Sequence, residues 1–270
     1  MGSVISCLAH VGDLTTPEAK GIGLTLYRCR QRRDRSAELD LELDQITRAE
    51  LPAFCPYPNK CDRSYVPSYD WGAPTLGDRH ERISEAVWHI PGWLEAEDAL
   101  KLYELAYFAA GPILEIGTYC GRSTVVSATA LADRGNGGAL VSLDIDSLAL
   151  SLAQRSARAH SVDEFIVFAC TSADKFLRAF PAFAPSMIFI DADHSEQGVY
   201  ADLAALESCV SVDTLLLFHD YLPMALPNTE GFPVSAEPIE VAETVNKSWL
   251  ATRAQFAGTF GASGLFRVVR

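Results

Sequence analysis

The sequence predicts an α/β protein built on a doubly wound, mostly parallel sheet of seven strands, with a C-terminal antiparallel hairpin and an N-terminal extension. Two observations support this fold class. From about residue 80, short continuous apolar runs alternate with segments of helical spacing. Such runs are typical of parallel strands that helices cover on both faces. The last two runs are joined by residues 260–264, Phe-Gly-Ala-Ser-Gly, and a connection this short indicates a hairpin.

Each element follows from its own pattern. Apolar residues at helical spacing predict a first helix over 95–110, which Pro112 ends. Five apolar runs predict the parallel strands, at 113–116, 139–143, 165–169, 186–190 and 214–218. The intervening helices are expected at 123–133, 147–160, 172–180 and 197–209. A helix near 238–249 and strands near 253–259 and 264–269 complete the domain.

The chain is expected to divide into an extension, residues 1–80, and a main domain, residues 81–270. The extension lacks sustained periodicity, although 23–30 suggests a strand and 38–50 a short helix. We consider two roles for it, a cap over the main domain and a contact in a homo-oligomer.

Composition excludes several classes of protein. With 270 residues, 49% of them hydrophobic, the chain is globular, and its net charge of −13 repels the phosphates of nucleic acid. It contains no run of 18 apolar residues, and its N-terminus lacks a charged segment followed by an apolar core, so neither a membrane partner nor a signal peptide is expected. Seven scattered cysteines fit reduced thiols, which predicts a cytoplasmic protein.

The first strand leads into the glycine-containing turn Glu-Ile-Gly-Thr-Tyr-Cys-Gly-Arg-Ser-Thr, residues 115–124. A dinucleotide fingerprint needs Gly-x-Gly-x-x-Gly, but Tyr119 and Arg122 occupy the places of its second and third glycines. This argues against NAD or FAD. The remaining pattern, Glu115-x-Gly117-x-x-x-Gly121, suits a ligand that carries an ammonium group, such as S-adenosylmethionine. A strand–helix turn without a ligand is the alternative.

The next two strand ends extend this candidate cofactor site. Asp144 closes the second strand, where a carboxylate can accept hydrogen bonds from both hydroxyls of a ribose. Asp146 is instead expected to cap the following helix. Ser172 and Ala173 open the helix after the third strand and are expected near an adenine, with simple helix capping as an equal alternative.

Acidic and imidazole side chains follow the fourth and fifth strands, as Asp191, Asp193 and His194 and as His219 and Asp220. Neighbouring parallel strands end side by side, so these groups are expected to converge. Converging carboxylates repel one another unless a cation lies between them. Oxygen ligands suit Mg²⁺ or Mn²⁺, while an imidazole favours Mn²⁺, Fe²⁺ or Zn²⁺. Structural Asp–His hydrogen bonds are the alternative.

Together, segments 115–124, 144–146, 190–203 and 218–221 resemble the class I S-adenosylmethionine-dependent methyltransferases, which have a Rossmann-like fold. The branch they resemble is metal-dependent and includes macrolide-sugar O-methyltransferases and cephalosporin-hydroxylase-like proteins. The resemblance covers residues 85–270. It implies that Glu115, Gly117, Gly121, Ser123 and Asp144 hold the cofactor, that Asp191 and Asp220 bind the metal and that His194 is the general base. The family often has Glu directly before the last Asp, whereas this chain has His219. From their places at the strand ends we add Tyr119, Ser172, Ala173 and Asp191 to the cofactor site, His219 to the site for Mg²⁺ or Mn²⁺, and Asp191 to the catalytic residues.

The resemblance therefore predicts an O-methyltransferase that acts on a hydroxyl of a small molecule, a glycoside or another natural product. Two other functions stay open. One is a metal-dependent hydroxylase-like enzyme on the same scaffold, and the other is a non-catalytic binding protein with a decayed site. Methyl transfer also requires that water be excluded, and five aromatic residues are candidates for a lid: Tyr65, Tyr69, Trp71, Trp88 and Trp93.

Overall fold

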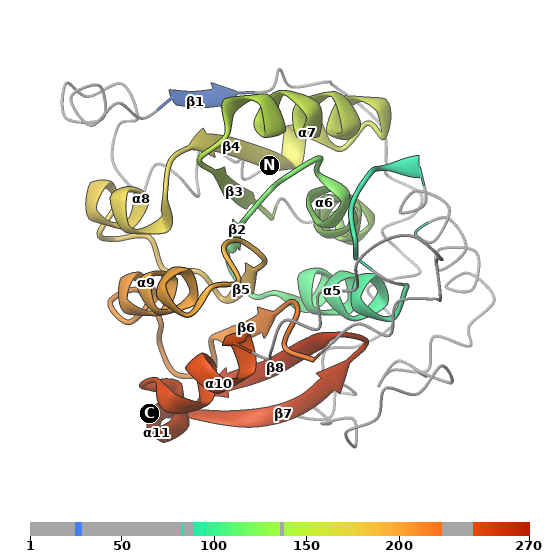
Figure 1. The fold of residues 1–270 in the computed structure, drawn as a ribbon. Helices are drawn as coiled ribbons and strands as arrows, with labels where there is room; N and C mark the ends of the chain where they lie inside the picture. Colours follow the sequence, from blue (N-terminus) through green and yellow to red (C-terminus); the bar gives the residue numbers. More distant parts are fainter. Residues whose placement is uncertain (1–24, 29–82, 84–88, 95, 136–137, 223–239) are drawn as a thin grey trace, which may run out of the picture.

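The computed structural model describes residues 25–28, 83, 89–94, 96–135, 138–222 and 240–270, which form a single sheet flanked by helices (Figure 1). Its strands are β1 (Thr25–Arg28), β2 (Ile113–Ile116), β3 (Leu140–Asp144), β4 (Ile166–Cys170), β5 (Met187–Ile190), β6 (Leu215–Phe218), β7 (Ala254–Phe260) and β8 (Ser263–Val268). Its helices are α5 (Ala96–Phe108), α6 (Arg122–Arg134), α7 (Ser147–Ala159), α8 (Ala173–Ala179), α9 (Glu196–Leu206), α10 (Glu240–Lys247) and α11 (Leu250–Arg253), with a 3₁₀ turn η1 (Asp163–Phe165) before β4.

The strand order is β1-β4-β3-β2-β5-β6-β8-β7. Strands β2 to β6 are mutually parallel, β8 runs antiparallel to β6, and β7 pairs with β8 as the predicted hairpin. All seven predicted strands are confirmed. An eighth, β1, falls within the strand suggested at 23–30 and lies antiparallel to β4. The helix suggested at 38–50 lies outside the described residues.

Helices cover both faces of the sheet, as the continuous apolar strands require. On one face, α5, α6 and α7 pack on strand residues such as Ile113 and Phe168. On the other face, α8 to α11 pack on residues such as Leu114 and Val141. Adjacent residues of one strand point to opposite faces, so both sets of side chains are buried in a core. Among the described residues, no helix is long and apolar enough to cross a membrane.

The helix boundaries have local causes. The Asp146 side chain accepts a hydrogen bond from the Leu148 N–H at 2.8 Å, which caps α7 as the sequence predicts. The Ser195 side chain caps α9 in the same way through the Gly198 N–H. At its carboxyl end, α6 stops at Gly135, whose φ of +73° is a left-handed conformation that favours glycine. The segment expected as one helix near 238–249 is divided into α10 and α11.

The topology fixes where a site can form. From β2 the chain passes to β3 on one side, and it later returns to place β5 on the other side of β2. The strand order therefore reverses between β2 and β5. In open α/β sheets, ligands bind at such a switch point, beyond the carboxyl ends of the strands. Gly117 follows β2 and Asp191 follows β5, so both residues border this point.

Candidate active site

The turn after β2 (residues 117–122) has a backbone that depends on two glycines, and we call it the cofactor loop because the sequence predicts a cofactor there. Gly117 has a φ of +93°, and a Cβ at this position would lie 1.9 Å from the carbonyl oxygen of Asp191. Gly121 has a φ of +86°, and its Cβ would lie 2.8 Å from Ala153 on α7. Only glycine tolerates both the left-handed conformation and the close approach. The loop is thereby packed directly against Asp191, which follows β5.

Asp144 fixes the shape of this loop. Its Oδ2 accepts hydrogen bonds from the backbone N–H groups of Thr118 at 3.0 Å and Tyr119 at 2.9 Å. Its Oδ1 accepts one from the N–H of Asp146 at 2.9 Å. Tyr119 adopts a φ of +45°, which is uncommon for a residue with a side chain. Asp144 thus organises the loop. That it also binds a ribose stays a prediction.

Glu115 lies inside the sheet, with only 1% of its surface exposed. Its Oε2 accepts hydrogen bonds from the hydroxyls of Thr124 at 2.6 Å and Ser142 at 2.5 Å. Its Oε1 has no hydrogen-bond partner among the described residues. Burial raises the pKa of this carboxyl to about 7, against the lowering effect of the neighbouring hydroxyls. Glu115 therefore connects β2 to α6 and β3 through these hydroxyls, and direct contact with a cofactor stays a prediction.

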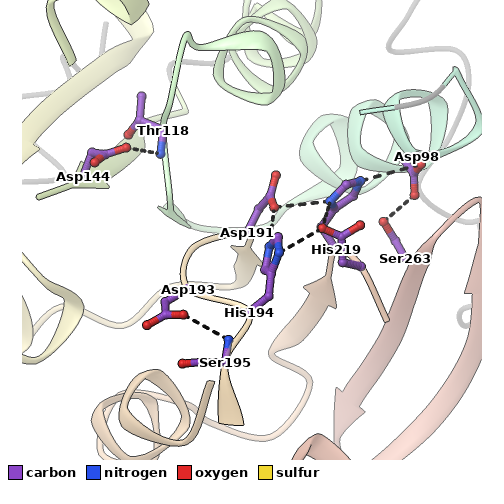
Figure 2. A network of polar contacts seen from close by, with 10 residues as sticks. Asp98, Thr118, Asp144, Asp191, Asp193, His194, Ser195, His219 and Ser263 are labelled. Carbon is purple, nitrogen blue, oxygen red and sulfur yellow. Dashed lines mark hydrogen bonds and ion pairs between the residues drawn. The ribbon is translucent and has the colours of Figure 1, made fainter. Parts of the chain in front are cut away.

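Four polar side chains converge beyond β5 and β6, and Figure 2 shows three of them, Asp191, His194 and His219, side by side. Asp191 Oδ1 lies 3.2 Å from His194 Nε2 and 3.2 Å from His219 Nδ1. Asp220 Oδ2 lies 3.2 Å from His194 Nδ1 and 3.4 Å from His219 Nδ1. Each carboxylate thus contacts both imidazoles. We call these four residues the acidic cluster, and for them the convergence expected from the sequence is observed.

The carboxylates and imidazoles of the cluster stabilise one another's charged forms. Burial alone raises the pKa of the Asp191 carboxyl, but the imidazoles of His219 and His194 hold it well below its usual range. The hydrogen bond to Asp191 raises the pKa of His194, although burial of the ring opposes the shift. His219 is 2% exposed, and burial lowers its pKa, but Asp191, Asp220 and Asp98 together raise it well above its usual value.

Three donors of the cluster fit a divalent cation. One ligand atom each from Asp191, His219 and Asp220 lies within 4.8 Å of the others. Both ring nitrogens of His219 are buried and make no hydrogen bond to a described residue, so Nδ1 is available as a ligand. Two carboxylates and an imidazole form a donor set that Mn²⁺, Fe²⁺ and Zn²⁺ accept.

The remaining predicted residues surround the same edge of the sheet. Ser123 is buried in the first turn of α6, and Ala173 is buried in the first turn of α8. Ser172 precedes α8 but makes no side-chain capping bond. Asp193 does not join the cluster, because its Oδ1 accepts a hydrogen bond from the Ser195 N–H at 3.0 Å.

Sequence reasoning assigned no role in the site to Arg122 or Asp98. Arg122 donates from Nε to the Ile90 carbonyl at 2.7 Å and from Nη1 to the Leu94 carbonyl at 3.0 Å. These bonds hold the segment 89–94 against the cofactor loop, where the exposed ring of Trp93 stacks on Tyr119 at 5.8 Å. The other four lid candidates lie outside the described residues. Asp98 is buried beside His219, and its only signal in the sequence is an acidic residue within a helix of apolar spacing.

Comparisons with known proteins agree with this geometry. Residues 114–221 match a family model described as a methyltransferase domain, a span that contains the cofactor loop, Asp144 and the acidic cluster. A search of curated proteins finds no significant match.

Solved structures share the fold. An O-methyltransferase from Bacillus cereus, solved with S-adenosylhomocysteine, has a TM-score of 0.52 at 18% identity, over 72% of this chain and 91% of that one. A putative O-methyltransferase from Klebsiella pneumoniae gives 0.52 at 23% identity, over 71% and 90%. The O-methyltransferase TomG of Streptomyces achromogenes, involved in tomaymycin synthesis and solved with S-adenosylmethionine, gives 0.52 at 18% identity, over 71% and 89%. Residues 114–221 therefore resemble a methyltransferase domain, and the chain shares the predicted α/β fold with these O-methyltransferases.

Proposed function

We propose that this protein is an O-methyltransferase that transfers the methyl group of S-adenosylmethionine to a hydroxyl of a small molecule, assisted by a divalent cation. One observation carries the proposal. The acidic cluster lies directly against the cofactor loop, because the carbonyl of Asp191 packs on Gly117. A cofactor on the loop and an acceptor at the cluster would therefore be neighbours.

The loop residues would bind and orient the cofactor. Asp144 holds the N–H groups of Thr118 and Tyr119 in place and so presets the loop before any ligand binds. We propose that Gly117, Tyr119, Gly121 and Ser123 contact the cofactor directly, with Ser172 and Ala173 beside its adenine. S-adenosylmethionine, when bound, supplies the electrophilic methyl group.

Asp191, His219 and Asp220 would hold the cation. Mg²⁺ and Mn²⁺ are the ions we propose, and the imidazole of His219 favours Mn²⁺ of the two. The bound ion would lower the pKa of an acceptor hydroxyl and orient it.

His194 is the residue that we assign as general base. Its side chain is 47% exposed, so an acceptor can reach the ring from solvent. A hydroxyl loses its proton as the new oxygen–carbon bond forms, and a positioned imidazole can accept that proton. Its contacts with Asp191 and Asp220 orient the ring and make it a stronger base than a free histidine.

The small-molecule class rests on indirect support. The structure solved from Streptomyces achromogenes is an O-methyltransferase involved in tomaymycin synthesis, which agrees with a natural-product acceptor. A glycoside or another vicinal diol suits the site, since two adjacent oxygens can reach one cation. We further propose a cytoplasmic protein without nucleic-acid or membrane partners, in which Cys120, Cys170 and Cys209 are free thiols. Residues 1–80 would serve as a cap or as the contact in a homo-oligomer.

The test combines binding and turnover. Calorimetry should show that the chain binds S-adenosylhomocysteine at sub-millimolar concentration, and the absence of binding would refute the proposal. Transfer of tritium from methyl-labelled S-adenosylmethionine to catechol or a methyl glycoside, with Mn²⁺ present, would then report activity. His194→Ala should lower the rate by about 10²–10⁴-fold and leave S-adenosylhomocysteine binding unchanged.

Two further results separate the alternatives. His160→Ala is the matched control for His194→Ala, because His160 bonds the Ser156 carbonyl at the end of α7 and is distant from the cluster in sequence. That variant should keep full activity. Oxygen consumption that depends on Fe²⁺ would instead support a hydroxylase-like enzyme, and the same rate for the wild-type and His194→Ala proteins would contradict the role of His194.

A further inference from the structure

We propose that Asp98 is a positioning residue that holds the ring of His219, so that Nδ1 faces Asp191 and Asp220 as a metal ligand. This inference rests on the metal site of the proposed function. It adds a buried partner, on a helix outside the four motifs, to the residues that the site requires.

Three buried residues from three elements form the contact. Asp98 lies in the first turn of α5 and is fully buried, His219 directly follows β6, and Ser263 begins β8 and is also fully buried. Ser263 Oγ donates a hydrogen bond to Asp98 Oδ1 at 2.5 Å. Asp98 Oδ2 lies 3.9 Å from His219 Nε2 (Figure 2). Ser263 therefore fixes the carboxylate that faces the ring.

The two nitrogens of His219 face opposite sides. Nδ1 lies 3.2 Å from Asp191 Oδ1 and 3.4 Å from Asp220 Oδ2, whereas Nε2 faces Asp98. A half-turn of the ring would replace Nδ1 by a carbon and remove a ligand from the cation site. Asp98 favours the observed orientation because its negative charge lies 3.9 Å from Nε2, the nitrogen that carries a proton when Nδ1 binds a cation. A shift of about 1 Å brings the pair from 3.9 Å to the ordinary N–H···O distance of about 2.9 Å.

With a cation bound, Asp98 and His219 would form a carboxylate–histidine–metal triad. In such triads the second carboxylate fixes the ring orientation and makes the histidine a better ligand, and its loss typically weakens metal binding by about 10- to 100-fold. Asp98 is suited to this role because its position is rigid. A Cβ added at Gly261 would lie 2.6 Å from Asp98 Oδ2, so the turn between β7 and β8 packs closely on the carboxylate.

The competing explanation is that Asp98 only stabilises the packing of α5 on β8 through its hydrogen bond with Ser263. Metal affinity distinguishes this explanation from a positioning role. Calorimetric titration with Mn²⁺ should give a Kd about 10- to 100-fold higher for Asp98→Ala than for the wild-type protein. Asp98→Asn keeps the shape of the side chain and one oxygen acceptor, so it should lose less affinity for Mn²⁺. It replaces the alanine variant in the titration if that variant does not fold. Ser263→Ala should weaken binding in the same direction.

Glu104→Gln is the matched control. Glu104 is a second buried acid of α5, but it pairs with Lys101 at 2.9 Å rather than with a residue of the cluster. This variant should lower stability and leave the Kd for Mn²⁺ unchanged. Equal Kd values for the wild-type, Asp98→Ala and Asp98→Asn proteins would overturn the inference.

A second readout makes the inference independent of metal binding. Crystal structures of the metal-free wild-type and Asp98→Ala proteins should show Nδ1 of His219 facing Asp191 in the former and a rotated ring in the latter. If the wild-type protein binds no Mn²⁺, the proposed metal site fails, and ring orientation alone decides the role of Asp98. An unrotated ring in Asp98→Ala would refute that role.

Discussion

Gly117→Ala adds a single methyl group at the tightest backbone contact of the site. The added carbon would lie 1.9 Å from the carbonyl oxygen of Asp191, whereas ordinary contact begins at 3.4 Å. The cofactor loop and the strand end after β5 must therefore separate by about 1.5 Å, the difference between these two distances. The φ of +93° adds strain for any residue other than glycine.

The cost can be estimated from the contacts that must change. A left-handed conformation costs a residue with a side chain about 1–2 kcal/mol. The separation would also stretch the hydrogen bond from the Asp191 N–H to the Ile116 carbonyl, which is 2.8 Å long. Such a bond contributes about 1 kcal/mol to the free energy of unfolding. Gly117→Ala should therefore lower the free energy of unfolding by about 2–3 kcal/mol. Binding of both S-adenosylhomocysteine and Mn²⁺ should weaken, because the contact joins the two proposed sites.

Chemical unfolding and calorimetry measure these effects, with Gly111→Ala as the matched control. Gly111 lies just before β2, has no positive φ, and would place its Cβ 3.4 Å from Ser186. The control should change stability by less than about 1 kcal/mol and leave both affinities intact. If Gly117→Ala matched the control in stability and in its affinities for S-adenosylhomocysteine and Mn²⁺, the inference that the cofactor loop and the acidic cluster depend on this contact would be wrong.

Three further predictions follow from single side chains. The folded-state pKa of Glu115, about 7, lies above its ordinary value of 4.5, so the free energy of unfolding should fall by about 3 kcal/mol as the pH rises through this window. Urea unfolding of Glu115→Gln should lack this fall, and an identical pH profile would contradict the assignment. Asp144→Ala removes the acceptor of two loop N–H groups and should weaken S-adenosylhomocysteine binding by about 10- to 100-fold. Asp144→Asn should weaken it less. Equal affinities of the wild-type and Asp144→Ala proteins in calorimetry would refute this. Arg122→Ala removes the hydrogen bonds to the Ile90 and Leu94 carbonyls, so it should lower the free energy of unfolding in urea by about 2 kcal/mol and expose residues 89–94 to proteolysis. Unchanged cleavage would contradict the role of Arg122 in holding this segment.

The sequence predicted the sheet well because burial on both faces requires continuous apolar strands. The same logic located the strand ends, and with them Asp191, His194, His219 and Asp220, since parallel strands end at one edge. The antiparallel pairing of β8 with β7 followed from the short connection between them. These features depend on local pattern and on general rules of connection, so one sequence suffices to infer them.

Contacts between distant segments were not accessible in this way. Asp98 and Ser263 are 165 residues apart, and neither stands in a pattern that suggests a polar partner. The bonds from Asp144 to the loop N–H groups depend on how the chain turns after Gly117, which residue types alone do not specify. The pairing of β1 with β4 likewise comes from tertiary position, because an isolated short strand leaves its partner open.

A crystal structure of the protein with S-adenosylhomocysteine and Mn²⁺ tests the central claim most directly. The nucleoside should lie along Gly117 and Asp144, with Mn²⁺ bound by Asp191, His219 and Asp220 at about 2.0–2.6 Å. A nucleoside bound away from the cofactor loop, or Mn²⁺ bound at other residues, would contradict the proposed site.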